Sequence, residues 1–141
     1  LMQPTIHATA IALRRKGAWY GVLVRGPSGA GKSDLALRLI AAGARLVADD
    51  RVHVWASQDA LFARSPSTIA GLIEVRGLGV VSAPTVDCVR VRLVVDLVDG
   101  TPERLPDPDF EKLCGIAILR LELNPRPASS STVVLRAIEA L

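Results

Sequence analysis

The stretch GVLVRGPSGAGKSDLALRLIAAGARLVADD, residues 21–50, decides the fold of this chain. Within it, GPSGAGKS fits the pattern G-x-x-x-x-G-K-[S/T], which forms a phosphate-binding loop between a strand and a helix. Residues 22–24 supply an apolar strand before the loop. After it, residues 34–42 repeat apolar side chains at helical spacing, and Gly43 stands where a helix often ends. The stretch therefore predicts a strand, a phosphate loop and a helix in direct succession.

Phosphate binding is predicted for the loop because backbone N–H groups and the positive end of a helix dipole attract anions. Lys32 is expected to reach the β and γ phosphates of a nucleotide, and the hydroxyl of Ser33 is the expected ligand of Mg²⁺, which prefers oxygen. A glycine turn without a ligand is the alternative. The predicted nucleotide-binding residues are Gly26, Pro27, Ser28, Gly29, Ala30, Gly31, Lys32 and Ser33.

Two adjacent carboxylates, Asp49 and Asp50, close the strand that follows the helix. Side chains alternate across a strand, so the two carboxylates are expected to face different ways. One is suited to accept a hydroxyl proton beside the γ-phosphate, while the other holds metal, water or a backbone amide. The alternative is a turn pair in which Asp50 only caps the backbone.

Composition favours one globular domain over residues 1–141, because half of the residues are hydrophobic and 22% are charged. The net charge of +3 is small and scattered, so no nucleic-acid surface is expected. The densest basic run, residues 14–16, is predicted to be an exposed hairpin tip. No apolar run approaches the roughly 20 residues of a membrane span and no signal-like start is visible, so we expect a cytoplasmic protein without membrane contact.

Strands are predicted to outnumber helices in the rest of the chain. Apolar runs predict a hairpin from residues 5–13 and 19–24, and further strands at 45–48, 52–55, 60–64, 71–80, 89–97 and 115–123, before a closing helix from about Thr132. Mostly antiparallel order around one phosphate-loop unit argues against an ordinary doubly wound sheet. Cys88 and Cys114 lack a second Cys or His at zinc spacing and are expected to be reduced core thiols.

A family resemblance follows from three segments: GPSGAGKS, RLVADD and IEVRGLGV occur in the order and spacing of bacterial HPr kinase/phosphorylase. The chain resembles the catalytic domain of that family over residues 6–135. The resemblance implies an α/β fold with a strand-rich mixed sheet, a P-loop kinase core of unusual strand order similar to phosphoenolpyruvate carboxykinase. It also implies a homo-hexamer that transfers the γ-phosphate of ATP to a serine of the phosphocarrier HPr. Many members reverse this modification with inorganic phosphate, releasing pyrophosphate.

The resemblance assigns roles to matching positions. Lys32 and Ser33 match the phosphate lysine and the magnesium serine, and Asp49 matches the aspartate that takes the serine proton. Glu74, in IEVRGLGV, falls on the second magnesium ligand, and Arg76 on the arginine of that signature. A solvent-facing strand pair is the alternative for these two residues.

Two further positions resemble active-site residues less closely. Arg104 resembles an active arginine of the family, although Pro106 stands where the family has glycine. His7 resembles the active-site histidine, and the alternative is a structural histidine on a strand. His53 has no counterpart in the family pattern and is expected to be structural.

The chain departs from the family in two places. The loop linked to dephosphorylation is only partly matched by NPRPASS, where Arg126 and Pro127 fit but Ser129 replaces a second basic residue. The N-terminal domain and the further C-terminal helix of longer members, which helps dock HPr, have no counterpart in these 141 residues. We therefore expect weaker phosphorolysis and a reduced or rearranged contact with the partner.

Two other functions compete with an HPr-type kinase. A small-molecule or nucleotide kinase on a P-loop core would be expected to carry an arginine-rich lid, and no such segment is evident. A regulatory module that binds nucleotide without catalysis would keep the P-loop but would need no base. Asp49 beside Asp50 speaks against this second alternative.

Overall fold

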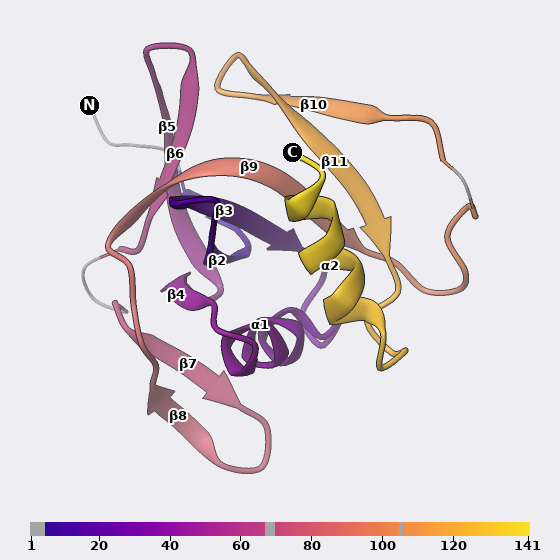
Figure 1. Cartoon of the computed structure of the whole chain (residues 1–141). Helices are drawn as coiled ribbons and strands as arrows, with labels where there is room; N and C mark the ends of the chain where they lie inside the picture. The colour runs from indigo at the N-terminus through magenta and orange to yellow at the C-terminus, as the bar shows by residue number, and fades with distance from the viewer. Residues whose placement is uncertain (1–4, 67–69, 105) are drawn as a thin grey trace.

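The computed structural model describes residues 5–66, 70–104 and 106–141. Strands dominate, as the sequence predicts, and two helices lie close together on one side (Figure 1). The elements are β1 (Thr5–His7), β2 (Thr9–Arg15), β3 (Ala18–Arg25), α1 (Lys32–Ala41), β4 (Arg45–Ala48), β5 (Arg51–Ser57), β6 (Ala60–Arg64), β7 (Leu72–Val75), β8 (Gly79–Ser82), β9 (Cys88–Leu97), β10 (Asp109–Leu113), β11 (Ile116–Leu123) and α2 (Ser130–Glu139).

One large mixed sheet organises the chain around the long strand β9. The strand order is β1-β5-β6-β9-β3-β2-β4, with β11 also pairing β9 and β10 pairing β11. β9 runs parallel to β3 and β11 but antiparallel to β6, and most other pairs are antiparallel. β7 and β8 form a separate two-stranded sheet that projects from the body (Figure 1). The order is therefore not that of an ordinary doubly wound sheet, as expected.

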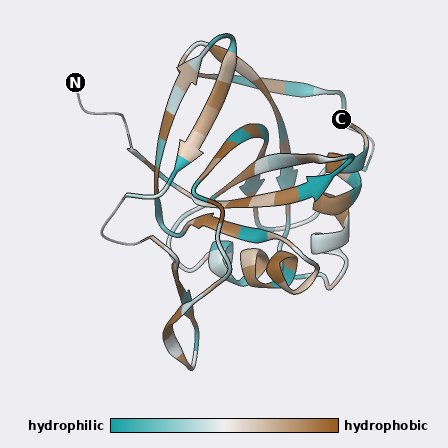
Figure 2. Cartoon of the chain, turned by 60° about the vertical axis from the view of Figure 1, so that its left-hand side comes forward, coloured by the Kyte–Doolittle hydropathy of each residue, from teal (hydrophilic) through white to brown (hydrophobic). Residues whose placement is uncertain are grey.

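Two apolar clusters lie on opposite faces of the central strands. On β3, Val22 and Val24 join the cluster that α1 and α2 cover, whereas Leu23 joins the cluster with β5 and β6. This division follows from the alternation of side chains along a strand. Apolar residues accordingly concentrate on the central strands (Figure 2). The buried apolar residues of α1 and α2 belong to the first cluster.

Close packing between β3 and β9 requires a glycine at position 21, on the strand that leads into the phosphate loop. A Cβ atom at Gly21 would lie 2.6 Å from the backbone oxygen of Arg90 on β9, so only glycine fits there. After the loop, α1 ends as predicted: Gly43 has φ +108°, its N–H donates to Ile40, and the N–H of Ala44 donates to Leu39. These two hydrogen bonds form the Schellman motif.

A partly buried network of charges joins β3 to the strands on its β11 side. Arg25, the residue before the phosphate loop, donates from Nε to Asp96 on β9 at 2.7 Å and from Nη1 to Glu111 on β10 at 2.6 Å. Arg120 on β11 donates to Asp96 from the other side. Burial raises the pKa of Asp96, but the hydrogen bonds from the two arginines outweigh it and hold that pKa below its usual value. The hydrogen bond from Arg25 lowers the pKa of Glu111 as well.

Several predicted elements are confirmed, and some details are wrong. The hairpins at 9–25 and 51–64, the strand at 45–48 and the closing helix are present, and residues 14–16 lie at a hairpin turn. The first run divides at Ala8 into β1 and β2, which pair with different strands. β10 was not predicted, because its segment follows a proline-rich stretch and, among the described strands, pairs with β11 alone.

The expectation that both cysteines lie in the core is wrong. Cys88 is exposed because it begins β9 on the outward-facing side of the alternation. Cys114 is exposed because it forms the turn between β10 and β11, with φ +51° beside Gly115. Both are free thiols. Separately, the part of the chain that the structure describes contains no helix long and apolar enough to cross a membrane.

Candidate functional site

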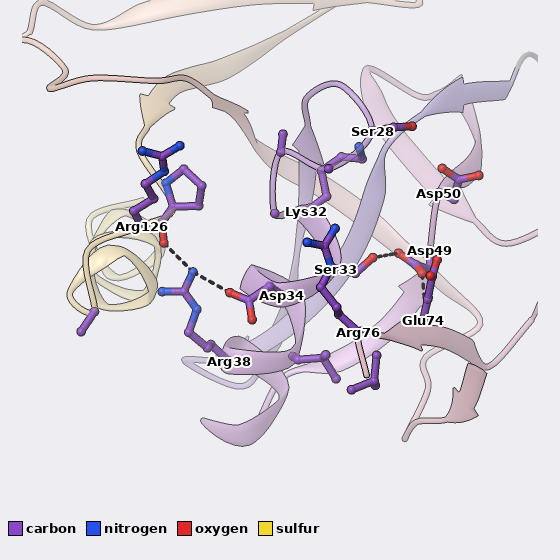
Figure 3. A pocket seen from close by; sticks show the side chains of 17 residues that line it. Ser28, Lys32, Ser33, Asp34, Arg38, Asp49, Asp50, Glu74, Arg76 and Arg126 are labelled. Atoms are coloured by element: carbon purple, nitrogen blue, oxygen red, sulfur yellow. Dashed lines mark hydrogen bonds and ion pairs between the residues drawn. The ribbon is translucent and has the colours of Figure 1, made fainter. Parts of the chain in front are cut away.

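A polar pocket of about 1050 Å³ opens at the N-terminus of α1. Four separate parts of the chain line it: the phosphate loop with the first turns of α1, the Asp49–Asp50 pair, the end of β7, and the loop between β11 and α2. Figure 3 shows Asp49, Asp50 and Glu74 on one side of the phosphate loop and Arg38 and Arg126 on the other. These parts are far apart in the sequence, and folding brings them together at the N-terminus of α1.

The phosphate loop has the left-handed backbone that its glycines allow. Gly29 has φ +81° and Gly31, the N-cap of α1, has φ +103°. Lys32 is only 7% exposed, and its ammonium donates to the carbonyl oxygens of Gly26 at 2.7 Å and Pro27 at 3.0 Å. The lysine is thus held within the curve of the loop, with its charge beside the backbone that would receive phosphate.

Asp49 is a buried carboxylate held by three donors. Its Oδ1 accepts from the hydroxyls of Ser33 at 2.8 Å and Thr9 at 2.9 Å, and its Oδ2 accepts from the backbone N–H of Glu74 at 3.2 Å. The side chain is 9% exposed and lines the pocket. Each carboxylate oxygen has two lone pairs, so Oδ1 is fully used by these donors and Oδ2 has one lone pair left.

Asp50 faces another way, as the alternation predicts, and a tight turn enforces the difference. Its φ is +69°, and the N–H of Arg51 donates across it to the oxygen of Asp49 at 2.8 Å, which is a γ-turn with positive φ. Such turns are strained and cluster at functional sites. The carboxylate of Asp50 lies 2.6 Å from Nε2 of His7, and both side chains are well exposed. His7 is therefore held next to the pocket through Asp50.

The β7 segment reaches the pocket through its backbone and its side chains. Glu74 and Arg76 are both exposed residues that line the pocket, as does Val75 between them. Because the N–H of Glu74 binds Asp49, this separate hairpin is tied to the buried carboxylate. The structure thus brings Glu74 and Arg76 together with Lys32 and Ser33.

The donors in the pocket fit Mg²⁺, which takes few protein oxygens and keeps ligands from substrate phosphates and water. Ser33 and Glu74 both line the pocket and supply a hydroxyl and a carboxylate. Among the residues described, no three His, Cys, Asp or Glu side chains form a cage that could hold a metal ion by themselves. Such a cage is not required for a magnesium ion that binds together with a nucleotide.

Four predicted site residues are not among those that line the main pocket: His7, Gly26, Pro27 and Arg104. Arg104 is exposed in the segment between β9 and β10 and is not among the lining residues, so its role stays a prediction. Pro27 lines a smaller pocket of about 220 Å³ beside the same loop, together with Leu97 and Asp99. Gly26 contributes its carbonyl to Lys32.

Sequence reasoning missed three lining residues on α1: Asp34, Leu37 and Arg38. Arg38 lies four residues after Asp34, with an ion pair of 3.2 Å between their side chains. Their spacing could have indicated this, because residues four apart on a helix lie on the same face, and this face follows Ser33.

Comparison with known proteins identifies the family of this chain. The family model described as the HPr Serine kinase C-terminal domain matches residues 5–139. The chain belongs to this family. The sequence is 36% identical over 129 residues to the HPr kinase/phosphorylase of Clostridium beijerinckii, covering 83% of this chain and 43% of that protein. It is also 36% identical over 128 residues to the HPr kinase/phosphorylase of Geobacillus thermodenitrificans, covering 82% of this chain and 41% of that protein.

A solved structure confirms the fold class. The Hpr(Ser) kinase/phosphatase from Coxiella burnetii superposes with a TM-score of 0.81 at 25% identity, covering 98% of this chain and 95% of that chain. The strand-rich mixed α/β sheet with its unusual order is therefore the fold of an HPr kinase C-terminal domain. The chain spans less than half the length of the curated relatives named above.

Proposed function

We propose that this chain transfers the γ-phosphate of ATP to a serine hydroxyl of HPr or a related phosphocarrier. The observation that carries the proposal is the buried Asp49 carboxylate, hydrogen-bonded to Ser33 at the end of the phosphate loop and sharing one pocket with Lys32. A nucleotide-binding module would need the loop and the lysine but no fixed base beside them. Membership of the HPr kinase family supports the same activity.

The chemistry follows from the free lone pair of Asp49. The serine hydroxyl of the acceptor gives its proton to Oδ2 of Asp49, since Oδ1 already accepts two hydrogen bonds. The serine oxygen forms a bond to the γ-phosphorus while the bond from that phosphorus to the bridging oxygen of ATP breaks, and ADP leaves. Lys32 and the loop amides stabilise the negative charge on the transferred group.

Magnesium is part of the proposal, with Ser33 and Glu74 as the residues that would hold it. When bound, Mg²⁺ would neutralise charge on the nucleotide phosphates. Since the Ser33 hydroxyl donates to Asp49, the carboxylate also orients the oxygen lone pairs of that serine. The backbone of Glu74 is fixed by the same carboxylate.

The reverse reaction is proposed to use the same groups. Inorganic phosphate would attack phosphoserine, pyrophosphate would form, and a protonated Asp49 would return its proton to the serine oxygen. Two anionic molecules must meet in this direction, so cations at the pocket matter more. Arg126 and Arg76, which line the pocket, are suited to this role, and the contributions of His7, Asp50 and Arg104 belong to the same proposal.

Assembly and location complete the proposal. We expect a homo-hexamer, because the chain belongs to the HPr kinase family, and light scattering on the purified chain would measure its mass. ATP as phosphate donor and a phosphocarrier as acceptor favour the cytoplasm. The proposed function involves neither nucleic acid nor a membrane.

Transfer of labelled phosphate tests the proposed function. The chain is incubated with radiolabelled ATP, Mg²⁺ and HPr, beside an HPr variant whose acceptor serine is alanine. Lys32→Ala should lower the rate about a hundredfold or more, because a preorganised charge at the γ-phosphate is lost. Lys112→Ala, an exposed lysine on β10, is the matched control and should retain activity.

Other results of this assay would contradict the proposed function or favour a different one. Unchanged turnover in Lys32→Ala would contradict the phosphate-loop mechanism. Binding of ATP without transfer to any protein would favour the regulatory module, and transfer to small hydroxyl compounds alone would favour a small-molecule kinase.

A further inference from the structure

Arg38 links the phosphate-loop helix to the loop between β11 and α2. Its Nη2 donates to the carbonyl oxygen of Pro125 at 2.6 Å, and its Nη1 donates to the carbonyl oxygen of Pro127 at 3.3 Å. The ion pair with Asp34 on the same helix orients the guanidinium. The two carbonyls flank Arg126, which lines the pocket (Figure 3).

The same loop is held from its other side by Asn124. The side-chain oxygen of Asn124 accepts from the backbone N–H of Arg126 at 3.0 Å, and its Nδ2 donates to Gly100 at 2.8 Å. Ser130, at the start of α2, donates to the backbone oxygen of Asn124. Arg126 is therefore an exposed residue of a loop whose backbone is fixed on both sides, with Arg38 as the contact to α1.

The polar contacts of the Arg38 guanidinium are made by its two terminal nitrogens. Nε of Arg38 is buried without a hydrogen-bond partner among the described protein atoms, and a buried donor left unpaired costs about 1–3 kcal/mol. What the side chain provides is a fork that reaches two carbonyls in fixed geometry. Lysine could not reproduce this fork, because its ammonium is a single point of charge on a flexible stem.

We propose that Arg38 is a positioning residue that holds Arg126 at the phosphate pocket. It acts through the backbone of residues 125–127, and it fixes the distance between the cation of Arg126 and the end of α1 where phosphate binds. Loss of Arg38 should therefore impair the same step that Arg126 supports. The inference rests on the proposed function, because that step is phosphate binding in the kinase and phosphorolysis reactions.

A double-mutant cycle tests this coupling. Arg38→Met, Arg126→Met and the double variant are compared for kcat and KM in ATP-dependent phosphorylation of HPr and in phosphorolysis of serine-phosphorylated HPr. We expect Arg38→Met to lower kcat/KM for phosphate by roughly tenfold to a hundredfold, since small misplacements of catalytic groups have effects of this size. The double variant should be no slower than Arg126→Met, because residues that act as one unit are not additive.

The controls separate positioning from general destabilisation. Arg136→Met removes an arginine of α2 that is 77% exposed and should leave both reactions unchanged. Arg38→Lys should rescue little, because it lacks the fork. Multiplicative losses in the double variant, or full rescue by Arg38→Lys, would overturn the proposal.

A binding measurement keeps the inference separate from the proposed function. Calorimetry with MgATP and with pyrophosphate reports on the pocket without an acceptor protein. If the unsubstituted chain binds these ligands but phosphorylates no acceptor, the proposed kinase function fails. The same cycle, measured as affinities, still decides the role of Arg38. Equal affinities in all four proteins, including no binding by any of them, would overturn it.

Discussion

Asp49 uses three of its four carboxylate lone pairs to join β2, α1 and β7, so it has a structural role besides the chemical role that we propose for it. The donors differ in kind. The hydroxyls of Thr9 and Ser33 can either donate or accept, whereas the backbone N–H of Glu74 can only donate. An asparagine at this position can keep all three hydrogen bonds by directing its oxygen to Glu74 and its amide to the hydroxyls. It cannot accept a proton.

Asp49→Asn should therefore separate nucleotide binding from chemistry. We expect ATP affinity to stay within a few-fold, because Lys32 and the loop backbone are unchanged. The rate of HPr phosphorylation should fall about 10²- to 10⁴-fold, the usual range for loss of a general base. Calorimetry with MgATP and the phosphotransfer assay measure the two quantities.

Asp50→Asn is the matched control for this prediction. Its amide oxygen can still accept a hydrogen bond from His7, and the hydroxyl of Ser33 donates to Asp49 rather than to Asp50. We expect the smaller loss of rate in this variant. An inactive Asp50→Asn beside a normal Asp49→Asn would show that the roles of the pair are reversed.

At the scale of elements, the loop between β11 and α2 adds positive charge to the pocket through Arg126. Pro125, Arg126 and Ala128 line the pocket, while Ser129 is the exposed N-cap of α2 directly after them. Because position 129 is a serine, the arginine that this loop contributes to the pocket is Arg126. The forward reaction needs less charge than the reverse, because ATP arrives with its phosphates already joined.

We therefore expect phosphorolysis to be slower than phosphorylation in this chain, and Ser129→Arg to raise it. The chain is given serine-phosphorylated HPr, Mg²⁺ and millimolar phosphate, and pyrophosphate release is followed beside the forward rate. Ser129→Gln lengthens the side chain without adding charge and is the control. Pyrophosphate release as fast as phosphorylation would contradict the first expectation, and equal rates in the two variants would contradict the second.

At the scale of the whole molecule, the network of Arg25, Arg120, Asp96 and Glu111 joins four strands below the phosphate loop. These ion pairs connect segments that lie up to 86 residues apart in the chain. Removal of one member leaves the others partly buried and poorly paired, which is more costly than loss of a surface pair. The network therefore links the stability of the sheet to pH.

The direction of that dependence follows from the lowered pKa values of Asp96 and Glu111. A carboxylate whose pKa is lower in the folded than in the unfolded chain stabilises the fold at pH values above its ordinary pKa, near 4. That contribution is lost as pH falls through the folded values. Thermal unfolding between pH 7 and pH 2 should show a nearly constant midpoint down to about pH 5 and a steep decrease below pH 4.

Variants identify the groups responsible. Asp96→Asn should lower the midpoint at pH 7 and flatten its decrease in acid, because the titrating group is absent. Glu139→Gln, which removes a partner of Arg136 on the surface of α2, should leave the shape of the curve unchanged. An unaltered acid decrease in Asp96→Asn would exclude the network as its main source.

The phosphate loop, α1 and the Asp49–Asp50 pair could be predicted from the sequence because their signals are local. Glycine at 29 and 31 permits the left-handed backbone of the loop, apolar spacing determines the helix, and Gly43 allows the motif that ends it. The alternation of side chains along a strand and the γ-turn at Asp50 both involve residues that are neighbours in the sequence. The resemblance of IEVRGLGV to the family signature also selected Glu74 and Arg76, which lie in the pocket.

Tertiary structure alone decided the central place of β9, the existence of β10, the exposure of both cysteines and the contact of Arg38 with Pro125. Each depends on partners distant in sequence, such as Arg38 and Pro125 at a separation of 87 positions, and no local pattern encodes which distant strand or loop will supply them. β10 lies in a charged segment and pairs with β11 alone among the strands that the structure describes. Its own residues therefore showed no apolar alternation to detect. The pairing is selected by burial of the whole sheet and by the charge network around Arg25, which form only once the chain is folded.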